Sequence, residues 1–171
     1  MRNSITENEI EDIALSYLQG LGYTYLLGTV ISPDGEHPEF PSTGGVPERR
    51  GGYNEVVLVT RLRNAIDKLN PTLSQDAKED ALKKVLRTES PNALINNENF
   101  HRYLTDGVDV EVRTDSGIRG EKIYIVDFEN PENNEFLAVN QFTVVEGNQN
   151  KRPDIILFIN GLPLVVIELK N

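Results

Sequence analysis

The amino-acid sequence predicts an α+β fold in which helices pack on a mixed or antiparallel β-sheet. Apolar residues recur at helical spacing through most of the first hundred residues, and from Val108 onward they alternate at the period of a β-strand. The chain ends in two apolar runs separated by Asn160 and Gly161, a pair typical of a β-hairpin turn. Helices followed by strands is the order expected of the α+β class.

The first helix is predicted by two overlapping capping boxes, at residues 4–7 and 6–9, in which a Ser or Thr is followed three residues later by Glu. Apolar residues then follow on one face, and Gly22 is expected to end the helix. Glu11 lies at the margin of this apolar face. Its position makes it a candidate for a role beyond solvation.

The sequence of the middle of the chain predicts a long loop followed by three more helices. Residues 28–54 are rich in glycine and proline and show no periodicity, so we expect a loop there. Ser74 is expected to cap the third helix, and Asn70-Pro71 is expected to stop the second. The three helices are expected at about residues 55–69, 74–87 and 91–104.

Three strands are expected before the hairpin, at residues 108–112, 122–128 and 136–145, with a bulge at Asn140-Gln141. Asp127 ends the second of these strands. It lacks the nearby Glu-x-Lys pattern that the hairpin carries, so we assign it a structural role.

The polar groups of the hairpin gather at its open end, away from the turn. Asp154 opens the first apolar run, and Glu168 and Lys170 close the second. Strands that are apolar on both faces are expected to be covered on both faces. Carboxylates at the rim of such a sheet must be paired, bound to a metal or strongly perturbed.

The turn imposes a condition on this site. Glu168 and Lys170 share a face, because side chains two residues apart in a strand point the same way. A regular hairpin with a two-residue turn at 160–161 would put Asp154 on the opposite face. A shared face therefore requires a three-residue loop or a bulge further along, and Pro163 favours such a bulge.

The residue types indicate metal-dependent phosphate chemistry. Asp154 and Glu168 supply hard oxygen ligands, and a carboxylate pair with little else is how proteins usually hold Mg²⁺. Such an ion activates a bound water and polarises a phosphoryl oxygen, and Lys170 could orient the attacking water or stabilise the charge that develops on the phosphate. The alternative is a surface hairpin whose end charges are only solvated, since such short patterns also occur by accident. Lys151 and Arg152 are expected to contact a phosphate or to pair with a carboxylate; the sequence leaves both open.

Composition limits the class of protein. A chain of 171 residues is expected to form one domain, and the absence of cysteine fits a reducing cytosol. No apolar run approaches the roughly 20 residues of a membrane span, so we expect a cytoplasmic domain without a membrane partner. The chain also shows no Ser/His or Cys/His pair of the kind that nucleophilic catalysis needs.

The net charge of −10 opposes DNA binding, because DNA affinity comes mainly from neutralised phosphates. Either the chain is not a nuclease, or other parts of a larger protein deliver the DNA to it.

Residues 141–170 resemble the amino-terminal nuclease domain of the R (restriction) subunit of type I restriction enzymes, a member of the PD-(D/E)XK nuclease superfamily. Asn70-Pro71 and the stretches 104–108 and 127–131 are similar to the same family. The resemblance implies a restriction-endonuclease-like mixed sheet, with residues 1–171 as a single, incomplete nuclease domain truncated after the Glu-x-Lys strand. It also leads us to expect a further helix, a strand and a Gln-x-x-x-Tyr motif beyond residue 171.

The resemblance implies the chemistry of a type I site-specific deoxyribonuclease, with Asp154 and Glu168 as Mg²⁺ ligands and Lys170 as the catalytic lysine. Many members of the superfamily carry a first-helix glutamate that reaches the metal. Leu18, Gly22 and Tyr23 match the helix ending of relatives that resolve DNA junctions. This match favours Glu11 as a further metal ligand, with a solvated helix glutamate as the alternative.

The partners implied by the resemblance are double-stranded DNA, the modification and specificity subunits, and motor domains of the same protein, where ATP would bind. The isolated chain is expected to be inactive. Two other functions stay open: a non-catalytic docking module for the motor or its partner subunits, and a related nuclease acting on branched DNA.

Overall fold

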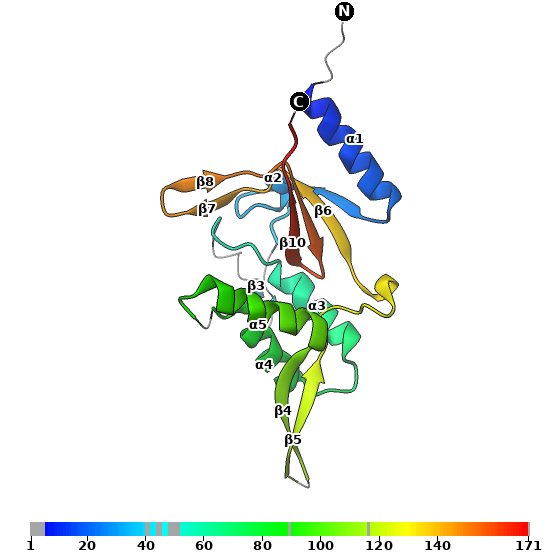
Figure 1. Cartoon of the computed structure of the whole chain (residues 1–171), viewed down its shortest axis with the longest axis vertical. Helices are drawn as coiled ribbons and strands as arrows, with labels where there is room; N and C mark the ends of the chain where they lie inside the picture. The colour runs from blue at the N-terminus through cyan, green and yellow to red at the C-terminus, as the bar shows by residue number, and fades with distance from the viewer. Residues whose placement is uncertain are drawn as a thin grey trace, which may run out of the picture. The chain divides into compact units, whose positions relative to one another are not determined.

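The computed structural model describes residues 6–39, 42–43, 46–47, 52–88, 90–115 and 117–170. The chain packs into two compact units: unit 1 comprises residues 1–60 and 135–171, and unit 2 comprises residues 61–134. Helices and a mixed sheet confirm the α+β class (Figure 1). The expectation that residues 1–171 form a single domain stays a prediction.

Helix α1 (Glu7–Gly20) carries the capping box expected at residues 6–9. The Thr6 hydroxyl accepts from the Glu9 N–H at 3.4 Å, and the Glu9 carboxylate accepts from the Thr6 N–H at 2.7 Å. Hydrogen bonds from the Thr6 N–H and hydroxyl hold the pKa of the Glu9 carboxyl below its ordinary value. Gly22, at φ +97°, ends the helix as predicted. The other capping box, at 4–7, begins outside the described residues.

The buried side of α1 differs from the predicted apolar stripe. Glu11 and Leu15 are its buried residues, whereas Ile13 and Tyr17 are exposed. The difference arises because side-chain amides inside unit 1 donate to the Glu11 carboxylate. A charged residue therefore occupies a buried position where an apolar residue was expected.

The sheet of unit 1 is mixed, with the strand order β1–β6–β9–β10. β1 runs parallel to β6, and the β6–β9 and β9–β10 pairs are antiparallel. β1 is too short to show an alternating pattern, and the sequence did not predict it. The strands are β1 (Thr24–Leu27), β6 (Phe136–Asn140), β9 (Ile155–Ile159) and β10 (Leu162–Ile167).

Each face of this sheet has its own apolar cluster. On the side that we call the α1 face, Leu15 packs with Ala138, Ile155 and Leu157. The opposite side, the Leu58 face, has a cluster consisting of Ile31, Leu58, Leu137, Val139, Phe142, Ile156 and Phe158. β9 is therefore covered on both faces, which explains its uninterrupted apolar run.

Part of the predicted 28–54 loop forms regular structure instead. Helix α2 (Gly28–Ile31) is a single turn whose Ile31 is buried in the Leu58-face cluster. β2 (Ser42–Thr43) pairs with β3 (Val46–Pro47). Ile31 lies in a glycine- and proline-rich stretch that shows no periodicity, so the sequence gives no signal for this contact.

The strand expected at 136–145 is two strands. After β6 the chain turns at Gln141, which has a φ of +55°, where the sequence indicated a bulge. β7 (Val144–Glu146) then pairs with β8 (Gln149–Lys151) in a separate hairpin (Figure 1).

The predicted helices of the middle region are present as α3 (Val59–Leu69), α4 (Gln75–Leu86) and α5 (Ala93–Asp106). Ser74 caps α4, as predicted, and Gly107 follows α5. α3 begins later than residue 55, because Leu58 extends into the unit 1 core, where its N–H donates to the Gly161 carbonyl at 2.9 Å.

β4 (Val108–Thr114) pairs with β5 (Gly117–Ile123) in unit 2. The sequence predicted a turn over most of β5, because its side chains are largely exposed and do not alternate. The strand predicted to run on to residue 128 stops at Ile123. There the Asn70 side chain bonds the N–H and the carbonyl of Tyr124, at 2.9 and 2.8 Å, in place of a partner strand. The 3₁₀ helix η1 (Pro131–Asn133) follows.

Candidate functional site

The β9–β10 hairpin turns at two residues with positive φ, Asn160 at +53° and Gly161 at +81°. This is the conformation of a two-residue type I′ turn, for which Asn-Gly is the preferred sequence. Asn160 is 1% exposed and bonded on both sides to Glu135: its carbonyl Oδ1 accepts from the Glu135 N–H at 2.8 Å, and its own N–H donates to the Glu135 carbonyl at 2.9 Å. The turn is therefore fixed to the start of β6.

A bulge follows the turn, as the shared-face condition requires. Pro163 pairs with Phe158 and Val165 pairs with Leu157, so Leu164 has no partner in β9. The extra residue shifts the register, and Ile167 pairs with Ile155. Continuing that register by one residue sets Glu168 opposite Asp154. The bulge, rather than a three-residue loop, supplies the alignment.

Alternation along the strands assigns the polar groups to one face. Ile156 belongs to the Leu58-face cluster and Ile155 to the α1-face cluster. Asp154 is two residues from Ile156, so it continues the Leu58 face. Glu168 and Lys170 continue the same face on the neighbouring chain segment. The arrangement is that of two carboxylates and an ammonium at one rim of the sheet.

The Asp154 carboxylate is half-buried and holds the end of β10. Its Oδ2 accepts from the Leu169 N–H at 2.6 Å, directly between Glu168 and Lys170. The Asp154 carbonyl accepts from the Gln141 N–H at 3.1 Å, which ties the site to the end of β6. These bonds fix the Asp154 backbone and bring the Glu-x-Lys segment against it.

Glu168 and Lys170 are exposed. Neither side chain makes a hydrogen bond or ion pair with another residue of the described part of the chain. Their charges are therefore available to a ligand, in contrast to ion-paired side chains of unit 2 such as Lys84 with Asp80 and Lys122 with Asp109.

Glu11 is buried at the end of the same sheet, but toward the α1 face. It is 8% exposed, and its carboxylate accepts from the Asn140 amide at 2.6 Å and from the Gln141 amide at 3.2 Å. Gln141 thus bonds Glu11 through its side chain and Asp154 through its backbone. Two amides satisfy Glu11, and no metal is required to compensate for its burial.

Two neighbours define the surroundings of Glu11. The Tyr25 hydroxyl donates to Asn140 Oδ1 at 3.0 Å, and burial, together with the charge of Glu11, raises the pKa of Tyr25. Gly28 packs directly on the backbone of residues 140–141, where an added Cβ would lie 2.7 Å from the Asn140 oxygen. The sequence reasoning did not identify Tyr25, Asn140 or Gln141 as site residues. The only signal was a polar pair at the end of an apolar strand.

Within the described residues, no group of three or more His, Cys, Asp or Glu side chains lies close enough to hold a metal ion together. Extending the β9–β10 register by one residue sets Glu168 opposite Asp154, and Gln141 links Glu11 to the Asp154 backbone. The roles assigned to all four site residues from the sequence stay predictions.

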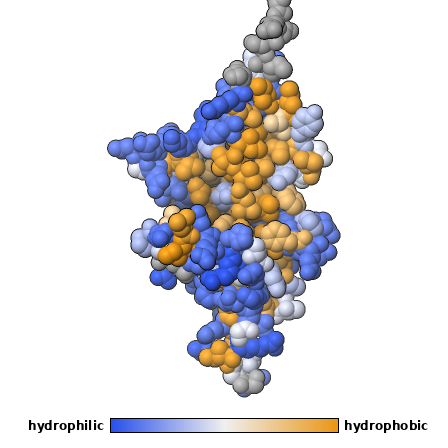
Figure 2. Space-filling view, in the orientation of Figure 1, coloured by the Kyte–Doolittle hydropathy of each residue, from blue (hydrophilic) through white to orange (hydrophobic). Residues whose placement is uncertain are grey.

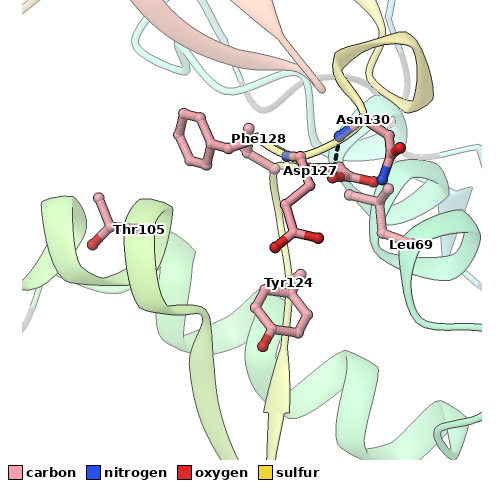
Figure 3. A pocket seen from close by; sticks show the side chains of 8 residues that line it. Leu69, Thr105, Tyr124, Asp127, Phe128 and Asn130 are labelled. Carbon is pink, nitrogen blue, oxygen red and sulfur yellow. Dashed lines mark hydrogen bonds between the residues drawn. The ribbon is translucent and has the colours of Figure 1, made fainter.

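A second aspartate, Asp127, lines a pocket of about 530 Å³ in unit 2 (Figure 3). Its carboxylate accepts from the Asn133 amide at 2.8 Å and from the backbone N–H groups of Asn130 and Glu129 at 2.9 and 3.1 Å. The Asn133 amide and the Asn130 N–H are the main causes that lower the Asp127 pKa. Asp127 closes a turn, which agrees with the structural role predicted for it.

The fold and site together define an α+β protein whose mixed sheet carries two acidic residues and a lysine at one rim, the lysine having no partner in the described part of the chain. The family model described as "Type I restriction enzyme R protein N terminus" matches residues 4–171, and the chain belongs to this family. None of the helices in the described ranges is long and apolar enough to cross a membrane.

Curated relatives agree with this assignment. The chain is 39% identical over 168 residues to the type I restriction enzyme HindI endonuclease subunit of Haemophilus influenzae. It is 31% identical over 165 residues to the putative type I restriction enzyme MjaIXP endonuclease subunit of Methanocaldococcus jannaschii. These matches cover 98% and 95% of this chain but only 15% of each relative.

Proposed function

We propose that this chain is the DNA-cleaving domain of a type I restriction enzyme R subunit, hydrolysing phosphodiester bonds with Mg²⁺. The observation that supports the proposal most is the bulge after Pro163, which sets Ile167 opposite Ile155, a register that extends to Glu168 opposite Asp154. In addition, Glu168 and Lys170 have no side-chain partner within the described residues. A hairpin with a purely structural role would have no need of this alignment.

Asp154 and Glu168 are the residues that would hold the ion. They fit Mg²⁺, because this ion keeps several waters and needs only one or two protein carboxylates. When bound, it would lower the pKa of a coordinated water and polarise the phosphoryl oxygen. Asp154 can serve as a ligand without rearrangement, since the Leu169 N–H already fixes one of its oxygens and orients the carboxylate.

Lys170 carries the positive charge of the proposed site. It lies two residues beyond Glu168, so it emerges on the same face and can bind a phosphate oxygen as negative charge develops there. Its ammonium has no partner among the described residues, so no ion pair has to break before it engages the substrate.

We propose that the full-length protein supplies what this chain lacks. The net charge of −10 disfavours DNA binding, and the chain spans 15% of the length of each of the two curated relatives described above. ATP-driven motor domains of the same protein, together with modification and specificity subunits, would deliver double-stranded DNA to the site. Sequence recognition would then belong to other subunits.

The test compares variants of the full-length protein within its assembled complex. We expect Asp154→Ala and Lys170→Ala each to reduce DNA cleavage by about a hundredfold or more, because each removes a group that acts on the reacting phosphate. ATP hydrolysis should be retained. Asp127→Asn, which also removes an aspartate charge, is the matched control and should cleave normally.

Normal cleavage by both Asp154→Ala and Lys170→Ala would contradict the proposal and support the non-catalytic docking module. Cleavage of linear and branched DNA by the unmodified protein distinguishes the remaining alternative. A strong preference for branched substrates would indicate the junction-type nuclease instead.

A further inference from the structure

The β7–β8 hairpin and the residue after it, residues 144–152, form a projection that we call the arm (Figure 1). The side chains from Glu146 to Arg152 are exposed. They include three consecutive amides, Asn148, Gln149 and Asn150, followed by Lys151 and Arg152. The proposed function assigns no role to this polar hairpin.

The arm is fixed to the core rather than only tethered to it. It follows Phe142, which is buried in the Leu58-face cluster, and it leads directly into Pro153 and Asp154. The Val145 N–H donates to the Tyr53 carbonyl at 2.9 Å, and the Tyr53 hydroxyl bonds to Asp34. Both ends and one edge of the arm are thereby held at a defined position beside the Asp154 rim.

The positive charge of unit 1 is concentrated at this position. Among the described residues of unit 1, the lysines and arginines are Lys151, Arg152 and Lys170, whereas acidic residues are spread over α1 and the segments that follow it. All three basic residues flank the Asp154 and Glu168 pair in the sequence. Within the described part of unit 1, the basic side chains therefore flank the Asp154 rim, and the other charged side chains are acidic.

These cations are not used within the protein. Lys151 and Arg152 form no ion pair with a carboxylate of the described residues, in contrast to Lys84 and Lys122 of unit 2, which pair with aspartates at 2.8 Å. The sequence left open whether Lys151 and Arg152 pair internally or meet a phosphate. In the described part of the chain, the structure shows no internal ion pair for Lys151 or Arg152.

We propose that the arm binds the phosphate backbone of double-stranded DNA and holds it against the Asp154 rim, an inference that rests on the proposed nuclease function. Lys and Arg side chains neutralise phosphates, and Asn and Gln side chains donate to phosphate and sugar oxygens. Such contacts position a duplex without reading its sequence. Apart from these basic residues, the charged side chains in the described part of unit 1 are acidic and repel DNA, which favours its approach at the arm.

The first test reverses the charge of the arm in the full-length complex. We expect Lys151→Glu with Arg152→Glu to slow cleavage by about tenfold at physiological salt, and lower salt to restore part of the rate. The matched control reverses two exposed cations of unit 2, Lys83→Glu with Arg87→Glu, and should cleave at the unmodified rate. ATP hydrolysis should be unchanged in both. Equal rates for the two double variants would overturn the proposal.

The second test has a readout independent of cleavage. A photo-crosslinking amino acid at Asn148 should crosslink to DNA in the assembled complex, and the same group at Asn97, an exposed residue of α5, should not. The experiment uses the Asp154→Asn background so that the DNA stays intact. Crosslinking at both positions, or at neither, would contradict docking on the arm.

The two proposals fail separately in these experiments. If Asp154→Asn abolishes cleavage but position 148 does not crosslink to DNA, the proposal that the arm binds DNA is wrong and the proposed nuclease function stands. If Asp154→Asn cleaves normally, the nuclease function itself is wrong.

Discussion

Asp127 in unit 2 and Asp154 in unit 1 each follow or open an apolar stretch of the chain, but their carboxylates have different surroundings. Asp127 accepts three hydrogen bonds from one turn, and these lower its pKa. Among the residues that the structure describes, the Asp154 carboxylate accepts one hydrogen bond, from the Leu169 N–H, and the nearby Glu168 and Lys170 side chains have no partner.

The difference teaches how a structural carboxylate is told apart from a candidate ligand. A carboxylate that already has a full set of local donors stabilises a turn and gains little from a metal. A carboxylate that keeps acceptor capacity beside a second acid has a reason to bind a cation. Hydrogen-bond satisfaction, rather than position at a strand end, separates Asp127 from Asp154.

Substitution of Glu11 is expected to have the largest effect on stability, because Glu11 is the most buried of these hydrogen-bonded carboxylates. Glu11→Ala would leave the Asn140 and Gln141 amides without their acceptor, so we expect the free energy of unfolding to fall by about 2–3 kcal/mol. Urea unfolding of the 171-residue chain measures this loss. A stability equal to that of the unmodified chain would show that Glu11 is not held by its amides.

The same residue tests the metal role predicted for it. If Glu11 is a ligand, Glu11→Gln should weaken Mn²⁺ binding by the full-length protein as Glu168→Gln does. If it acts only through its amides, Mn²⁺ affinity should stay unchanged while stability falls. Comparing the two glutamine variants distinguishes these roles.

Asn134→Ala is expected to have the next largest effect. The Asn134 amide donates to the Asp127 and Pro131 carbonyls, at 2.7 and 3.1 Å, and its oxygen accepts from the Asp127 N–H at 2.9 Å. Losing these bonds should lower the free energy of unfolding by about 1–2 kcal/mol. An unchanged denaturation midpoint would weaken the comparison, because the Asp127 turn would then contribute little to folding.

The lowered pKa of Asp127 predicts that the stability of the folded chain depends on pH. Its folded-state pKa is lowered, so its contribution is fully present above the unfolded-state pKa, about 3.9, and is lost as the pH falls through the folded-state pKa. Asp127→Asn should therefore destabilise the chain at neutral pH and flatten the acid side of its stability profile. Unfolding midpoints between pH 2 and 7 test this; parallel profiles for the two proteins would contradict it.

Asp154→Asn is expected to have the smallest effect on stability. An asparagine oxygen can still accept from the Leu169 N–H, so the change in unfolding free energy should be below about 1 kcal/mol. Thermal unfolding gives the value. A loss greater than that of Asn134→Ala would mean that Asp154, too, is mainly structural.

The sequence predicted those features that depend on local chemistry. Three such features depend on residues close together in the sequence, and the structure confirms all of them: the Thr6–Glu9 capping box, the Ser74 cap and the Asn160-Gly161 turn. A bulge was one of two predicted ways to bring Asp154 and Glu168 to the same face of the hairpin. Pro163 favoured the bulge because it has no N–H to donate to the neighbouring strand, and the structure contains the bulge.

The features that escaped prediction depend on distant partners. Glu11 is buried only because Asn140 and Gln141 lie far away in sequence and donate to it. β5 ends where Asn70 bonds the backbone of Tyr124, and β1 becomes a strand only by pairing with β6. No local pattern encodes such contacts, so periodicity placed β5 wrongly and missed β1.

The most direct test of the account is a Mn²⁺ titration of the full-length protein without nucleotide. The double variant Asp154→Asn with Glu168→Gln should bind about one ion fewer than the unmodified protein, because the aligned carboxylates are the ligands. Asp127→Asn should bind the same number as the unmodified protein. Equal binding by all three proteins would contradict the claim that the aligned pair at the rim of the sheet holds a metal ion.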